Sequence, residues 1–100
     1  MSGAEMIAAE RRRQVEVEGY APEHDARLGT EELTDAALAY ALASEAPDNK
    51  GHVKSAFAGW WPWSARAWKP TGDRVRDLVK AGALIAAAID VELASRGGAE

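Results

Sequence analysis

The chain has 100 residues, of which 47% are hydrophobic, and a formal net charge of −4. This length suits one domain around a single modest core, and the negative charge argues against a general or sequence-specific nucleic-acid-binding protein. The absence of cysteine excludes disulfide bonds and thiolate zinc sites. The first residues lack the order of a signal peptide, and the longest apolar run is shorter than a membrane span. We therefore expect a cytoplasmic protein with no membrane partner.

Three segments have helical patterns, and they predict one all-α domain over residues 1–100. The helices are expected at about residues 3–18, 30–46 and 73–95. The predicted architecture is a three-helix assembly with a long Trp-rich connector between the second and third helices. Because alanine dominates the apolar residues, the core needs closely packed helices and a few large anchors. A homo-oligomer that completes this core is expected.

The ends of the first two helices carry local signals. Ser2 and Glu5 have the spacing of a capping box, and Gly19 is a natural stop for the first helix. Thr30 can cap the second helix.

The third helix follows Pro70, with Thr71 or Asp73 as its cap, and ends before Gly97. Alanines in this helix let a neighbouring backbone approach closely. The larger apolar residues and one glycine form a single stripe: Leu78, Gly82, Ile85, Ile89 and Leu93.

The connector, residues 47–70, is long for a compact domain, and such loops are commonly functional or disordered. Its first part, residues 48–55, is polar and is expected to be mobile. Its second part should be packed, because five large aromatic side chains there are costly to leave in water. They are Phe57, Trp60, Trp61, Trp63 and Trp68. The indoles can fill the alanine-rich core or stack on a base, and we favour the core for most of them.

Three consecutive arginines at residues 11–13 cannot share one helix face, so at least one should point toward the core or an interface. Such an arginine can bind a phosphate or form an ion pair. We favour the ion pair, with Glu16, Glu18 or Asp77 as partner.

The remaining titratable residues form weaker patterns. His24 beside Asp25 can serve base or metal chemistry, but a role in fixing the loop is favoured. Paired carboxylates on different helices can hold magnesium, although the helix dipole alone accounts for Glu31 and Glu32. No metal or cofactor is predicted.

Several ordered segments resemble a family of phage and prophage early-region proteins. They are residues 10–16 (ERRRQVE), 18–25 (EGYAPEHD), 61–63 (WPW), 68–70 (WKP) and 73–85 (DRVRDLVKAGALI). This chain has Ala26 and three alanines at residues 86–88 where the family usually has acidic residues, which weakens a carboxylate–metal mechanism. The order of a helix, a Trp-rich loop, a Lys-Pro pair and a charged helix is also distantly similar to the ryanodine-receptor-like repeat domain of some nucleotide-sensing proteins.

The resemblance implies a phage accessory protein, a class that includes small inhibitors acting by sequestration. We therefore expect a non-enzymatic protein that captures a nucleotide-type ligand in the host cytosol, such as a host immune signalling molecule. A base would stack on an indole, and phosphates would bind cations near the start of the third helix. The expected ligand-binding residues are Arg12, Arg13, Tyr20, His24, Trp60, Trp61, Trp63, Trp68, Lys69, Arg74, Arg76 and Lys80.

Two alternatives come from other classes of function. One is a magnesium-dependent nucleotide pyrophosphohydrolase that uses carboxylates such as Glu16, Glu32, Asp35 and Asp90. The other is an inhibitor that blocks a host protein through an exposed aromatic patch.

Overall fold

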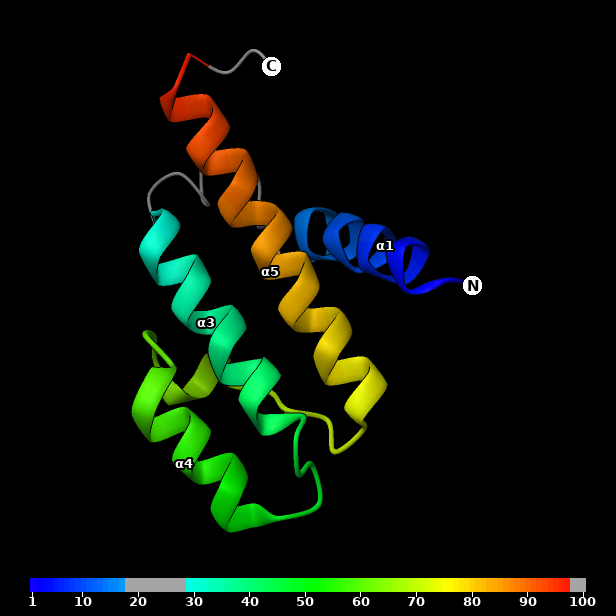
Figure 1. The fold of residues 1–100 in the computed structure, drawn as a ribbon, viewed down its shortest axis with the longest axis vertical. Coiled ribbons are helices and arrows are strands. Elements are labelled where there is room, and N and C mark those ends of the chain that lie inside the picture. Colours follow the sequence, from blue (N-terminus) through cyan, green and yellow to red (C-terminus); the bar gives the residue numbers. More distant parts are fainter. Residues whose placement is uncertain (18–28, 98–100) are drawn as a thin grey trace.

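The computed structural model describes residues 1–17 and 29–97 (Figure 1). Within these residues the chain forms α-helices, one short 3-10 turn and no strand, so the all-α prediction is confirmed. The predicted roles of Glu18, Gly19, Tyr20, His24 and Asp25 lie outside the described residues. The helices, labelled as in Figure 1, are α1 (Gly3–Glu16), α3 (Thr30–Ala43), α4 (Lys50–Trp60) and α5 (Arg74–Ser95), with η1 (Ala65–Ala67) between α4 and α5.

Local capping residues set most of the helix ends. The predicted capping box is present, because Ser2 Oγ accepts from Glu5 N and Glu5 Oε1 accepts from Ser2 N. Asp73 caps α5 by accepting from Val75 N. The prediction for α3 was wrong by one residue: the cap is Gly29, whose φ of 85° suits glycine.

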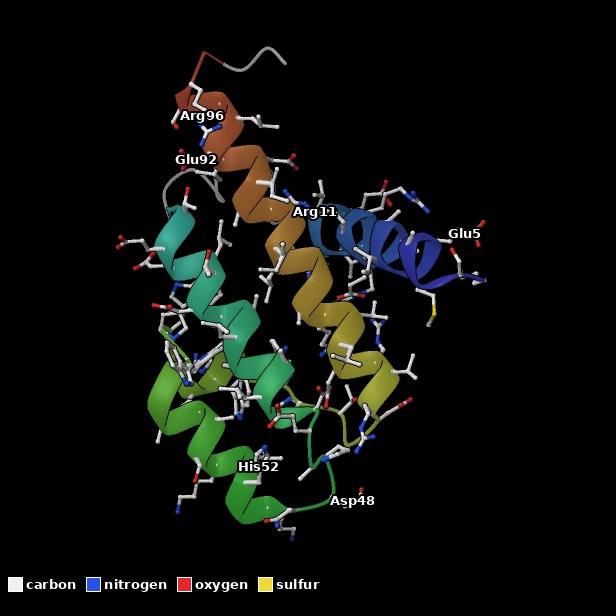
Figure 2. The ribbon with its side chains drawn as sticks, in the orientation of Figure 1. Glu5, Arg11, Asp48, His52, Glu92 and Arg96 are labelled. Atoms are coloured by element: carbon white, nitrogen blue, oxygen red, sulfur yellow. The ribbon has the colours of Figure 1, made fainter. Side chains whose placement is uncertain are left out.

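The predicted mobile segment at residues 48–55 is the beginning of α4, so that prediction was wrong. Asn49 caps this helix by accepting a hydrogen bond from His52 N at 3.0 Å. The His52 ring lies against α3, with Nε2 2.6 Å from the carbonyl oxygen of Leu42 (Figure 2). Val53, Ala56 and Phe57 supply the apolar helical spacing, although the other residues of the segment 48–55 (DNKGHVKS) are polar or glycine.

The helices pack in the order α4, α3, α5 and α1 (Figure 1). The buried core contains Leu33 and Tyr40 from α3 and Leu84 from α5, and its other members are mostly alanines. Three indoles pack against this core and are themselves partly buried, as the composition required: Trp61, Trp63 and Trp68. Trp60 is the exception, because 45% of its surface is exposed.

The core face of α5 is the alanine face and not the stripe of larger residues. Asp77, Val79, Ala81, Ala83, Leu84, Ala87 and Ala88 are buried, whereas Leu78, Ile85, Ile89 and Leu93 are between 39% and 53% exposed. Small side chains let α3 and α1 approach α5 closely from two sides.

Gly82 marks the contact between α5 and α1. A Cβ atom at this position would lie 2.5 Å from Cδ1 and 2.8 Å from Cγ1 of Ile7. We therefore expect Gly82→Val to destabilise the protein by about 1–3 kcal/mol through overpacking, measured by thermal unfolding. Gly59→Val is the matched control, because a Cβ at helical Gly59 meets nothing within 4 Å. Equal melting temperatures for the two variants would show that α1 does not pack on α5 in this way.

Candidate functional site

Four of the five large aromatic side chains of the connector form one cluster with Tyr40 of α3, and Trp60 is the exception. We call this the aromatic cluster: Tyr40, Phe57, Trp61, Trp63 and Trp68. Trp68 is its centre, with ring centroids 4.8 Å from Tyr40, 5.0 Å from Trp61 and 6.0 Å from Phe57. Trp61 makes edge-to-face contacts with Tyr40 and Trp63, at ring-centroid distances of 5.4 and 5.1 Å. Aromatic pairs favour this arrangement.

Hydrogen bonds hold the connector on this cluster. Lys69 N donates to the Tyr40 hydroxyl at 3.1 Å, and Trp61 Nε1 donates to the Ser64 carbonyl oxygen at 3.0 Å. The Lys80 ammonium donates to the Lys69 carbonyl oxygen at 2.8 Å and lies 5.4 Å from the centre of the Tyr40 ring. Main-chain and side-chain contacts therefore fix the segment between α4 and α5.

On the α1 side of the cluster lies a cavity of about 80 Å³, which we call the inner cavity. Five of the predicted site residues line it: Arg13, Trp61, Trp63, Lys69 and Lys80. Two polar atoms there, Gln14 Oε1 and Trp63 Nε1, are buried with no hydrogen-bond partner among the described residues. At about 30 Å³ per water molecule, this space suits a few waters or one small polar group. It is far below the roughly 300 Å³ at which small-molecule pockets begin.

The polar wall of the inner cavity is built on Glu10, whose side chain is only 1% exposed. Arg13 pairs with both carboxylate oxygens at 2.9 and 2.8 Å, and Arg76 of α5 pairs with Oε1. Burial alone would raise the pKa of Glu10, but the hydrogen bonds from Arg13 and Arg76 outweigh it and lower that pKa. Burial also lowers the pKa of Lys80, and the Glu10 charge opposes part of this shift. The ion-pair role favoured for the arginines is confirmed for Arg13, although its partner is Glu10.

The other arginines of the first helix are separate from this site. Arg11 is 3.8 Å from Asp90 of α5 (Figure 2), and Arg12 is exposed. The predicted partner Asp77 accepts hydrogen bonds from Thr71. Arg74, another predicted site residue, donates to the carbonyl oxygens of residues 44 and 45.

A larger groove lies between α4 and residues 65–72, and we call it the outer groove. Its volume is about 350 Å³, within the usual range for small-molecule sites. Phe57 and Trp68 form its aromatic wall, while Lys50 and Lys54 lie one helical turn apart on α4. The remaining lining residues are Pro47, Val53, Ala65, Pro70 and Gly72.

The outer groove is locally basic in an acidic chain. Residues 49–72 contain no aspartate or glutamate but have four cations, although the whole chain carries a net charge of −4. Neither Lys50 nor Lys54 pairs with a carboxylate in the described part of the chain. Sequence reasoning missed both lysines, because residues 48–55 were expected to be mobile. The acid-free run was the signal that could have found them.

Within residues 1–17 and 29–97, no group of three or more histidine or acidic side chains could hold a metal ion. None of the helices found there has the length and apolar character needed to cross a bilayer.

The chain was compared with protein-family models, with curated proteins and with solved structures. None of the three comparisons finds a match.

Proposed function

We propose that the protein binds a nucleotide-type ligand in the outer groove and acts by sequestering it. The observation that carries the proposal is the aromatic wall of Phe57 and Trp68 beside Lys50 and Lys54, which pair with no carboxylate of residues 1–17 and 29–97. Such a groove offers an apolar surface for a planar ring and separate cations for an anion. A nucleotide combines these two chemical groups in one small molecule.

The expected binding mode follows from the geometry of the groove. A base stacks on the indole of Trp68, whose contacts with Tyr40 and Trp61 hold it in place, so little side-chain entropy is lost on binding. Stacking on an aromatic side chain contributes about 1–3 kcal/mol per base. The phosphates lie near Lys50 and Lys54, at the N-terminal end of α4, where helix N–H groups also favour an anion.

The wider role that we propose is counter-defence by a phage-encoded protein that removes a host immune signalling nucleotide. Support for this setting comes from the ordered resemblance of residues 10–25 and 61–85 to phage early-region proteins. A binding role suits the groove, which pairs aromatic rings with lysines and has no acidic side chain in its lining.

Removing the groove lysines should weaken binding of adenine and guanine nucleotides. We expect Lys50→Gln/Lys54→Gln to raise the Kd by about 10–100-fold, because two charge-assisted phosphate contacts are lost. Calorimetry and quenching of Trp fluorescence measure the Kd. Arg12→Gln is the control: Arg12 was an expected ligand-binding residue, but it is an exposed residue of α1 that does not line the groove. Adenosine and inorganic phosphate, titrated separately, should each bind more weakly than the nucleotide.

Two results would count against this proposal. If no adenine or guanine nucleotide, cyclic dinucleotides included, changes the fluorescence or the melting temperature at millimolar concentration, the groove is not a nucleotide site. Release of a hydrolysis product in the presence of magnesium would instead favour the pyrophosphohydrolase alternative.

The exposed indole of Trp60 supports the second alternative, an inhibitor of a host protein. In that case Trp60→Ser would abolish capture of a host protein and leave nucleotide binding unchanged.

A further inference from the structure

The exposed apolar stripe of α5 has the spacing of a coiled-coil interface. Val75, Leu78, Gly82, Ile85 and Ile89 follow one another at intervals of three and four residues, the pattern by which one helix packs along another. We call these five residues the α5 seam. The side chains of the four seam residues other than Gly82 are 41–54% exposed, and α1 borders the seam at Gly82, where Ile7 packs.

Neighbouring residues extend the apolar surface. Ile7 of α1 covers Gly82, and Leu93 continues the seam with 39% exposure. Five of the nine large hydrophobic side chains that are exposed in the described residues belong to α5: Val75, Leu78, Ile85, Ile89 and Leu93. A concentration of this kind on one helix marks an interaction surface.

We propose that the α5 seam is a homodimer interface in which α5 of a second copy packs antiparallel. The helix α5 has 22 residues and is about 33 Å long at 1.5 Å per residue. An identical helix matches its heptad seam in length and spacing. Antiparallel packing places Leu78 opposite Ile89 of the second copy, and it places Ile85 opposite the Gly82 position, which Ile7 of α1 covers. The same patch then serves both subunits, as a closed two-fold dimer requires.

The charges at the ends of the seam favour the antiparallel direction. At its N-terminal end Arg74 donates, within residues 1–17 and 29–97, to the main-chain carbonyl oxygens of residues 44 and 45 and to no carboxylate. At its C-terminal end Asp90 and Glu92 pair with Arg11 and Arg96 of the same chain, and their side chains remain 66% and 44% exposed. Antiparallel packing brings Arg74 near these carboxylates of the second copy. It also places the two helix dipoles in opposite directions, which is the favourable arrangement. Parallel packing would place Arg74 beside Arg74.

Sedimentation velocity and light scattering test the association. The chain should be a dimer at micromolar concentration, and Ile89→Lys should raise the dimer dissociation constant at least about tenfold by placing a charge in the interface. Val17→Lys is the matched control: Val17 is 71% exposed and lies at the end of α1. Because Ile89 is itself 53% exposed, the helical circular dichroism of Ile89→Lys should match that of the control. A monomer at all concentrations up to about a millimolar would overturn the proposal.

Engineered cysteines test the direction, since the natural chain has none. In an antiparallel dimer Leu78→Cys/Ile89→Cys should form covalent dimers under mild oxidation, because opposed seam positions bring the Cβ atoms near disulfide distance. Each single variant should stay uncrosslinked. Rapid self-crosslinking of either single variant would show parallel packing and overturn the antiparallel arrangement.

Discussion

Replacing Glu10 by Gln is expected to lower the free energy of unfolding by about 2–4 kcal/mol. Glu10 is the buried partner of two arginines, Arg13 beside it on α1 and Arg76 on α5. Removing one member of a buried ion pair leaves the other charges uncompensated, which typically costs about 3–5 kcal/mol. The expected loss of stability here begins at a smaller value, about 2 kcal/mol. The arginine side chains are 35% and 36% exposed, so water can screen part of their uncompensated charge. Urea unfolding followed by circular dichroism gives the value.

Glu16→Gln is the control for this variant, since Glu16 is an exposed residue of the same helix. It should change the stability by less than about 0.5 kcal/mol. Equal stabilities for the two variants would contradict the view that Glu10 joins α1 to α5.

The pH dependence of stability gives an independent check on Glu10. In the folded protein the pKa of Glu10 lies below its ordinary value of 4.5, so the ionised carboxylate favours folding. Its contribution is complete above the unfolded pKa and is lost as the pH falls through the folded pKa. The stability difference between the natural protein and Glu10→Gln should therefore be constant near neutral pH and shrink below about pH 4.5. A difference that stays constant down to pH 3 would assign the effect to packing rather than to charge.

Signals that lie close together in the sequence predicted the all-α class and several helix ends. Ser2 with Glu5 and Asp73 with Val75 act within three residues, so their geometry does not depend on the rest of the fold. The clustered indoles predicted a packed connector, because side chains of that size are costly to leave in water.

Helix faces and distant partners could not be predicted in the same way. In α5 the larger residues suggested one face, but close packing with α3 and α1 buries the alanine face, since the approach of two backbones rewards small side chains. The Glu10–Arg76 pair joins residues 66 positions apart, and no local spacing encodes such a contact. Lys50 and Lys54 were overlooked because residues 48–55 are polar and were expected to be mobile, although Asn49 carries a capping signal.

Replacing Asp77 by Ala is the second change with a large expected effect. Asp77 is fully buried in the first turn of α5. Its Oδ1 accepts from Thr71 N at 2.9 Å and from Thr71 Oγ1 at 2.8 Å, so it ties the end of the connector to the start of the helix. Losing two hydrogen bonds to a charged acceptor, together with the favourable helix-dipole contact, should cost about 2–3 kcal/mol. Thermal unfolding measures this loss.

Asp48→Ala serves as the matched control, because Asp48 is exposed in the loop before α4 (Figure 2). A double-mutant cycle with Thr71→Val isolates the hydroxyl part of the Asp77–Thr71 contact, and a coupling energy of about 1 kcal/mol or more is expected. Additive effects of the two substitutions would instead place the cost of Asp77→Ala in the bond from the Thr71 N–H, which valine keeps, and in the cavity left behind. Because Thr71 follows Pro70 of the outer groove, loss of this contact should also weaken nucleotide binding, even at temperatures where the helices remain folded. The groove therefore depends on a carboxylate that does not line it.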